Sequence, residues 1–253
     1  PDLSFTERII YGLDFVKAKY VCITGDSQIP RIEKIPKLKE YINNDFDLIV
    51  FSHRDAKKLK YKEYDDIVEL FKDDCWGMTS FGTTYFKISS YLPINKTDFL
   101  SKYKANCFPQ IGLYFDYFRN DKFKGVYIGE SIIKYSEYKK ITYWSNSMLD
   151  TFGRQWVEVI NGLDKKFDDY KKQVILDHGT YSSLKINKSY GFIVWRATNN
   201  LDIERFYIYK DFIYKISKVK NWKVKMIALI PKWICYLIFL FVRIFNKLMS
   251  GGR

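Results

Sequence analysis

The chain has 253 residues and carries 42 Lys and Arg against 29 Asp and Glu, a formal net charge of +13. Aromatic residues make up 19% and hydrophobic residues 47%, which excludes a disordered or low-complexity chain. Residues 210–253 contain ten Lys and Arg and one acid, so this segment alone holds +9 and leaves +4 for residues 1–209. Because the larger part is only mildly basic and has no recognised nucleic-acid module, we expect no nucleic-acid partner.

The N-terminal third predicts alternating helices and strands. Ser4 and Glu7 form the S-x-x-E pattern of a capping box, which opens a helix. Residues 20–24 and 47–52 are short apolar runs typical of buried strands, and residues 36–43 predict a helix with Pro36 at its first position. This alternation favours an α/β fold with a mostly parallel sheet flanked by helices.

The remainder of the chain predicts more helix than strand. We expect strands within 76–88 and 125–134, and helices within 63–72, 97–104, 110–120, 145–162, 165–177 and 198–219. We divide the chain into residues 1–197, an α/β domain, and residues 198–253, a helical, basic and apolar tail. The four cysteines are far apart, without a C-x-x-C motif, so a zinc site and a disulfide framework are not expected.

The tail predicts membrane association. Residues 226–242 contain one charged residue, Lys232, whereas a full span needs about 20 apolar residues. We therefore expect a helix that lies in the bilayer interface, with the following residues at the headgroups: Trp222, Lys223, Lys225, Trp233 and Arg243. A helix packed on the domain core and a true membrane span remain alternatives.

The loop after the first strand holds the main candidate for a ligand site. Ligands of open α/β sheets bind outside the carboxyl ends of the strands, and Gly25 and Asp26 lie at such an end. A carboxylate there can hold a divalent cation that bridges a diphosphate, and glycine lets the ligand approach the backbone. The alternative is an ordinary Gly-Asp turn.

The order of these features resembles a known family. Residues 12–26, a helix leading into a strand that ends in Gly25-Asp26, resemble the centre of bacterial family 2 glycosyltransferases of the GT-A fold, a Rossmann-like architecture. In that family an Asp-x-Asp-type motif binds a metal ion and the diphosphate of a nucleotide sugar. The resemblance implies that Asp26 holds Mn²⁺ or Mg²⁺ and, together with Gly25 and Arg54, binds the donor diphosphate.

Further segments follow the family's order more loosely, and some residues depart from it. Residues 76–82, 109–112, 125–128 and 144–147 resemble the acceptor half, a late strand and the loop before a long helix. Ser27 and Gln28 stand where further acids are common, and Gln110 stands near the place of an acidic base. The family's first β–α–β unit has no counterpart before residue 4, so we expect N-terminal sequence to be missing.

No residue is assigned as the catalytic base. His53 follows the second strand and is a candidate base or phosphate contact, whereas Asp116 lies about two turns into its helix. Trp144 and Trp156 are candidates to cover an acceptor sugar, although a packed amphipathic helix explains Trp156 equally.

The sequence-based hypothesis is a glycosyltransferase on the cytoplasmic face of a bacterial membrane, bound peripherally. It would transfer a sugar from a nucleotide-sugar donor to a lipid-linked glycan during synthesis of a surface polysaccharide such as capsule or exopolysaccharide. The rival is a non-catalytic, membrane-associated scaffold with a degenerate transferase fold.

Overall fold

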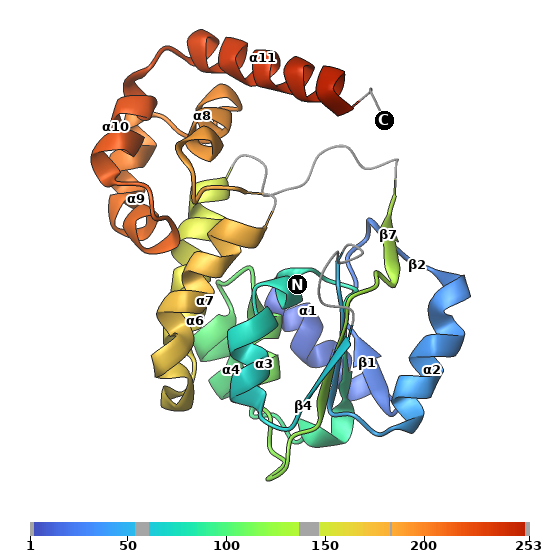
Figure 1. Cartoon of the computed structure of the whole chain (residues 1–253). Helices are drawn as coiled ribbons and strands as arrows, with labels where there is room; N and C mark the ends of the chain where they lie inside the picture. Colours follow the sequence, from blue (N-terminus) through green and yellow to red (C-terminus); the bar gives the residue numbers. More distant parts are fainter. Residues whose placement is uncertain (1–2, 54–60, 137–146, 183, 251–253) are drawn as a thin grey trace. The chain divides into compact units, whose positions relative to one another are not determined.

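The computed structural model describes residues 3–53, 61–136, 147–182 and 184–250, without the side chains of Lys247 and Ser250 (Figure 1). The chain forms two compact units. Unit 1 comprises Pro1–Lys140 and Val159–Val174, and unit 2 comprises Ile141–Glu158 and Ile175–Arg253. This division differs from the boundary at residue 197 in the sequence-based scheme, because helices on both sides of that residue pack together in unit 2.

Unit 1 alternates helices and strands, as the sequence predicts. Its main elements are α1 (Phe5–Gly12), β1 (Tyr20–Cys22), β2 (Gln28–Pro30), α2 (Ile35–Asn43), β3 (Leu48–Phe51), β4 (Tyr61–Tyr64), α3 (Ile67–Asp74), β5 (Thr84–Lys87), α4 (Lys96–Tyr103), α5 (Pro109–Asp116), β6 (Gly125–Ile128) and β7 (Ile133–Tyr135). The predicted capping box is present, because the Ser4 hydroxyl accepts from the backbone of Glu7 and the Glu7 carboxylate accepts from the backbone of Ser4.

The central sheet has the strand order β1-β5-β3-β6-β4. Its one parallel pairing is β3 with β6, and the other three pairings are antiparallel. The prediction of a mostly parallel sheet was therefore wrong: β5 inserts between β1 and β3 in the opposite direction, and β4 adds antiparallel to β6. As a result β1, β3 and β6 run in the same direction. Strands β2 and β7 form a separate antiparallel pair.

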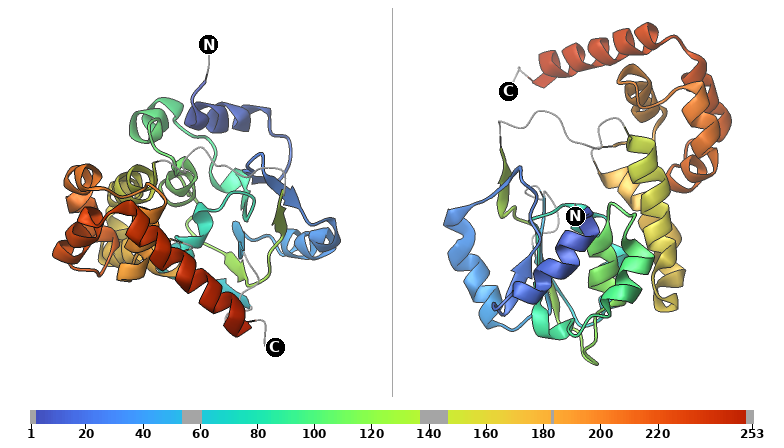
Figure 2. Two further views of the ribbon diagram at one scale, coloured as in Figure 1. Left: turned by 90° about the horizontal axis from the view of Figure 1, so that it is seen from above. Right: turned by 180° about the vertical axis from the view of Figure 1, so that it is seen from behind.

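Helices cover both faces of the sheet (Figures 1 and 2). Every residue of β3 is buried, which agrees with its uninterrupted apolar run. On one face Ile49 and Phe51 pack with Leu38 and Tyr41 of α2. On the other face an aromatic cluster forms, in which Phe71 of α3 lies 5.2 Å from Phe115 and 4.6 Å from Phe167 between ring centroids.

Three predicted elements differ from the structure. Residues 61–64 form strand β4, so the helix predicted from residue 63 begins only at Ile67. Within 76–88 only Thr84–Lys87 is a strand, and Gly77–Thr79 is a short 3-10 helix, η3. The apolar run at 125–134 contains two strands, β6 and β7, which belong to different sheets.

Unit 2 is helical in the residues that the structure describes. A π-helical segment, η6 (Leu149–Gln155), leads into α6 (Trp156–Gly162), which passes into unit 1 after Glu158, and the chain returns to unit 2 within α7 (Asp168–Tyr181) at Ile175. The helices that follow in unit 2 are α8 (Ser189–Ala197), α9 (Ile203–Ile216), α10 (Asn221–Leu229) and α11 (Lys232–Ser250). Helix α8 was not predicted. α11 packs on α8, and α10 packs on α9 and α8. Pro231 separates α10 from α11, as expected for a residue that cannot donate to the preceding turn.

Candidate functional site

Three strand ends meet at one edge of the sheet. Because β1, β3 and β6 run in the same direction, their carboxyl ends lie on the same side, which we call the carboxyl edge. Gly25 and Asp26 follow β1, and His53 follows β3. β5 lies between β1 and β3. The usual spacing between neighbouring strands therefore puts the ends of β1 and β3 about 10 Å from each other. The sequence correctly predicted that both loops follow strand ends of this kind.

Residues 76–82, the crossing segment, connect the two strand ends along the carboxyl edge. The Trp76 ring contacts His53 edge-on at 5.7 Å between centroids. At its other end, the backbone N–H of Gly82 donates to the carbonyl of Ile23 at 2.7 Å. This segment, which was predicted as part of a strand, therefore runs from the loop after β3 to the loop after β1.

Gln28 stabilises the turn that carries Asp26. The backbone N–H of Gly25 donates to Oε1 of Gln28 at 2.7 Å, and the backbone N–H of Gln28 donates to the carbonyl of Gly25 at 3.1 Å. Gly82, at φ +75°, lies against the same amide, since a Cβ there would be 3.2 Å from Gln28 Oε1. Gln28 departs from the family's acidic motif, and here it closes this turn.

The metal expectation rests on Asp26 alone. Among the described residues no group of three or more His, Cys, Asp and Glu side chains could hold a metal ion. Mg²⁺ in nucleotide sites is commonly bound by one or two carboxylates together with substrate phosphates and water. The described residues therefore do not fit a resident metal ion, and they leave open a cation that arrives with a diphosphate.

The other predicted site residues are not all at this edge. Arg54 and Trp144 lie outside the described residues. Trp156 is in unit 2, where its fully buried ring packs 4.8 Å from His178, so it presents no face to a sugar. Its burial agrees with the alternative of a packed helix.

Asp116 has a structural role in unit 1. Its carboxylate accepts hydrogen bonds from the Tyr103 hydroxyl, from Lys102 Nζ and, at 2.9 Å, from the backbone of Asp164. Gln110, at the start of the same helix, donates from Nε2 to the carbonyl of Thr79 in the crossing segment, at 3.3 Å. Six residues of helix place Asp116 about 9 Å further along the axis than Gln110. These contacts weaken its candidacy as a base.

Glu130 is a site residue that the sequence analysis missed. It follows β6 and accepts from Lys34 at 2.7 Å and from Lys37 at 2.6 Å. Hydrogen bonds from Lys34 and then Lys37 lower the pKa of Glu130 to about 2. The sequence does not show this cluster, because the two lysines lie more than ninety residues before Glu130.

Asp74 is a second missed residue, at the last position of α3. Its side chain is half-buried, and burial, followed by repulsion from Asp73, raises its pKa well above the ordinary value. Two consecutive acids at the C-terminal end of a helix oppose the helix dipole. That unfavourable pattern is visible in the sequence and could have drawn attention to the pair.

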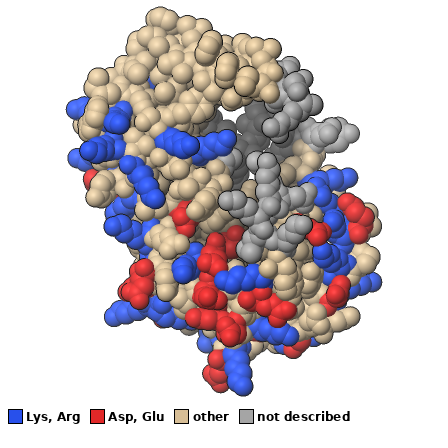
Figure 3. Space-filling model, viewed as in Figure 1, with Lys and Arg blue, Asp and Glu red and all other residues tan. Residues whose placement is uncertain are grey.

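The tail exposes an extensive apolar surface. On α11 the following large apolar side chains are exposed: Trp233, Tyr236, Leu237, Ile238, Phe241, Ile244, Phe245, Leu248 and Met249. In Figure 3 the surface over α11 is nearly free of charge on the face shown, and Lys and Arg side chains gather over α9 and α10. Trp222 is also exposed, with Lys223 Nζ 5.6 Å from its ring centroid.

No single helix in the described part of the chain has both the length and the apolar composition to cross a bilayer. The stretches Asn221–Leu229 and Lys232–Asn246 pass the same criteria when they are taken together, with a bend of 105° at the break between them.

Comparisons with known proteins do not identify a family. No protein-family model, no curated protein and no solved structure matches the chain. The functional interpretation therefore depends on the fold, the carboxyl edge and the tail.

Proposed function

We propose that the protein is a membrane-associated glycosyltransferase with a GT-A-like α/β domain. It transfers a sugar from a nucleotide-sugar donor to a lipid-linked glycan at the cytoplasmic face of a bacterial membrane, in the synthesis of a surface polysaccharide. The observation that carries the proposal is the common carboxyl edge of β1, β3 and β6, where the turn with Asp26 and the loop with His53 are joined by the crossing segment.

The chemistry that this edge offers is suited to an anionic donor. The turn at Gly25 is held by Gln28, so the Asp26 backbone is fixed next to the end of β1. A cation bound with the donor would bring a diphosphate to Asp26, and it would neutralise charge on the leaving group. His53 follows β3, the next strand that runs in the same direction as β1, and its imidazole can contact a phosphate or a hydroxyl there.

The tail supplies the second part of the proposal. An exposed apolar helix beside basic helices is the combination by which interfacial helices bind anionic bilayers. Trp222, Trp233 and Arg243 are all exposed, as a headgroup-level position requires. An enzyme that acts on lipid-linked acceptors gains local concentration by binding the same membrane.

A donor panel tests the catalytic part. The protein is incubated with a set of nucleotide sugars, a lipid-linked acceptor extract and Mn²⁺ or Mg²⁺, and release of nucleoside diphosphate is measured. We expect turnover with one donor, its loss with EDTA, and a large loss in Asp26→Ala. The exposed Asp121→Ala is the matched control and should retain the wild-type rate. Absence of turnover with every donor would refute the enzyme assignment.

Flotation with anionic and neutral vesicles tests the membrane part. Trp233 and Phe241 are 65% and 71% exposed, so replacing both by Ser removes apolar surface without opening a core. The variant should shift to the soluble fraction, and the control Phe15→Ser, at a side chain 83% exposed in unit 1, should float as wild type does. Equal flotation of all three proteins would show that the exposed face of α11 does not bind the vesicles.

A non-catalytic membrane scaffold is the second candidate. It is favoured by Ser27 and Gln28 in place of acids, and by Gln110, whose amide is used to hold the carbonyl of Thr79. A scaffold predicts vesicle binding without turnover, whereas a transferase predicts both, so the two experiments above separate these functions.

A further inference from the structure

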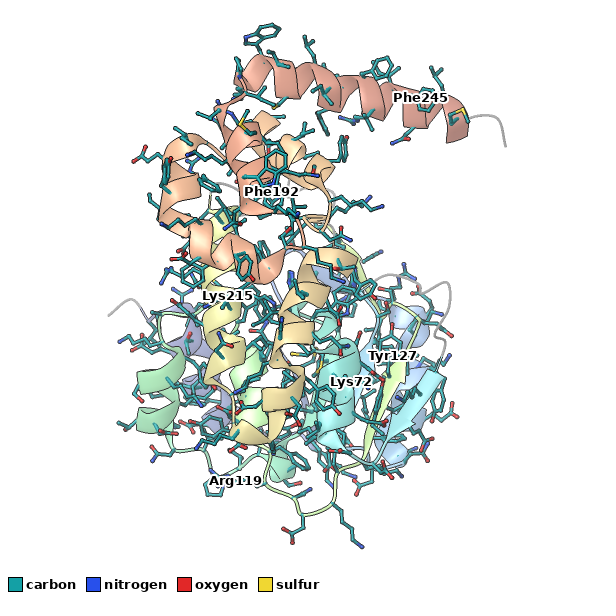
Figure 4. The ribbon with its side chains drawn as sticks, turned by 60° about the vertical axis from the view of Figure 1, so that its left-hand side comes forward. Lys72, Arg119, Tyr127, Phe192, Lys215 and Phe245 are labelled. Carbon is teal, nitrogen blue, oxygen red and sulfur yellow. The ribbon has the colours of Figure 1, made fainter. Side chains whose placement is uncertain are left out.

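Unit 1 carries an exposed apolar surface of its own, next to the carboxyl edge. Strand β2 begins at Gln28, which closes the turn with Asp26, and β2 pairs with β7. These two strands lie beside the start of α2 in both Figure 1 and Figure 2. β6, on which Figure 4 labels Tyr127, leads from the central sheet into β7. A short 3-10 helix, η2 (Ile32–Lys34), joins β2 to α2.

Three isoleucines of this connection are exposed. Ile32 is 77% exposed, and Ile29 and Ile35 are exposed as well. The backbone N–H of Ile35 donates to the carbonyl of Ile32, the hydrogen bond of a 3-10 turn, in which side chains three residues apart lie above one another. Ile32 and Ile35 therefore form an apolar row. Single exposed apolar residues are ordinary, whereas several close together mark an interaction surface.

Basic side chains lie alongside this row. The backbone N–H of Lys34 donates to the carbonyl of Arg31 at 2.9 Å, so these two side chains are aligned on a second side of the same turn. Lys37 follows three residues later, and its ammonium group contacts the same Glu130 carboxylate as that of Lys34. An apolar row and a basic row thus run side by side along η2 and into α2.

The same combination occurs on the two-stranded ribbon. Ile29 pairs in register with Lys134 of β7, so their side chains lie on the same face, and both are exposed. With the acids Glu33 and Glu130 included, the region holds four cations and two acids, a formal charge of +2. We call the apolar and basic residues together the ribbon surface, which consists of Ile29, Arg31, Ile32, Lys34, Ile35, Lys37 and Lys134.

This composition is complementary to an anionic bilayer. Apolar side chains enter the boundary between headgroups and acyl chains, and the attraction of Lys and Arg to anionic headgroups adds to the binding. Long basic side chains next to an apolar row can keep their charge at the headgroups while their stems cover apolar surface. A protein partner with its own apolar patch is the alternative occupant, and the basic row favours the bilayer.

We propose that the ribbon surface is a second membrane contact, on unit 1, which holds the carboxyl edge at the headgroup level of an anionic bilayer. The inference rests on the membrane part of the proposed function and extends it, because the tail belongs to unit 2. Since Gln28 both closes the turn with Asp26 and starts β2, the candidate site then lies at the depth of a lipid-linked acceptor's headgroup. The ribbon surface is the smaller contact, since α11 exposes more large apolar side chains.

A fluorophore at position 32 tests insertion directly. Ile32→Cys is labelled in the whole chain with an environment-sensitive thiol reagent and mixed with anionic vesicles. Phe15→Cys, before β1, is the matched control, and labelled wild type gives the background from the native cysteines. Emission should shift to the blue at position 32 and stay constant at position 15. Unchanged emission at position 32 in a chain that floats would overturn the proposal. So would a shift that follows protein concentration without vesicles, which would assign the surface to a protein partner.

Vesicle affinity tests the apolar and basic residues separately. Ile29→Ser combined with Ile32→Ser should weaken partition into anionic vesicles by about tenfold or more, the loss of about one buried isoleucine side chain. Arg31→Gln and Lys134→Gln should each weaken it by about fivefold and leave binding to neutral vesicles unchanged. Lys17→Gln, an exposed lysine before β1, should bind as wild type does.

The outcomes distinguish this contact from the tail. All substituted side chains are partly or largely exposed, so the thermal midpoints should stay at the wild-type value. If wild type binds vesicles and the isoleucine variant binds with equal affinity, the ribbon surface is not a membrane contact, and the proposed role of the tail stands. If wild type itself does not bind, the membrane part of the proposed function fails together with this inference.

Discussion

Gly112→Ala should destabilise unit 1 although alanine is the better helix former. Gly112 lies in α5, and an added Cβ would meet three ring atoms of Tyr103 at 2.3, 2.4 and 2.7 Å. The ring cannot move away easily, because it is 1% exposed, packs 5.2 Å from Phe99 and donates its hydroxyl to Asp116. Overpacking of this kind costs about 1–3 kcal/mol.

Gly12→Ala is the matched control, since no atom lies within 4 Å of its added Cβ. Removing glycine from a helical position stabilises by about 0.5–1 kcal/mol when the space is open. The same chemical change should therefore lower the free energy of unfolding at position 112 and raise it at position 12. Urea denaturation followed by circular dichroism measures both.

Tyr103→Leu in the Gly112→Ala background gives a second check. The smaller side chain should relieve the contact, so the double variant should lose less stability than the sum of the two single variants. A Gly112→Ala protein as stable as wild type, or a strictly additive double variant, would refute the packing described for α4 and α5.

Three further outcomes are expected. Asp47→Ala should lower the free energy of unfolding by about 3 kcal/mol, because each buried donor left unpaired costs about 1–3 kcal/mol. The Asp47 carboxylate accepts from Ser90 at 2.6 Å and from two further donors. A loss in urea denaturation smaller than that of substitutions at exposed positions would contradict this. The pKa of Glu130 is lowered to about 2 from 4.5, so its contribution to the free energy of unfolding is present above pH 4.5 and is lost as the pH falls toward 2. In Glu130→Gln the urea midpoint should therefore change less with pH over that range than in wild type. The same pH dependence in both proteins would refute this. Gly179→Ala should destabilise unit 2 by about 1–3 kcal/mol, since its Cβ would lie 2.4 Å from the carbonyl oxygen of Ile216; a thermal midpoint at or above wild type would be the contrary result.

Local signals were sufficient for much of unit 1. The capping box at Ser4 and Glu7 and the apolar run of β3 each depend on a few neighbouring residues, and the structure confirms both. The helix predicted over residues 36–43 is present as α2, but it begins at Ile35, so Pro36 is its second residue and not its first. The direction of the strands depends on distant pairing. Nothing near residues 84–87 indicates that β5 lies between β1 and β3, so the sheet was expected to be mostly parallel.

The same distinction applies to the candidate site. The positions of Asp26 and His53 after strand ends could be predicted, because a strand end is a local feature. The approach of Trp76 to His53 and of two lysines to Glu130 is produced by the tertiary fold, and no short sequence pattern encodes it. The burial of Trp156 was also undecidable from helical spacing alone, since a stripe of apolar residues serves equally for a core and for a ligand surface.

The two ends of the central sheet differ in how they meet solvent. β4, at one end, carries Lys62 and Glu63, and charges on an outer strand discourage pairing with another molecule. β1, at the other end, consists of Tyr20, Val21 and Cys22 and carries no charge. The nearest charge that could discourage pairing is Lys19, directly before the strand. Charge therefore guards the β4 end of the sheet more than the β1 end. Purified protein should self-associate through β1 before it does so through β4, and a Val21→Lys substitution should reduce that association.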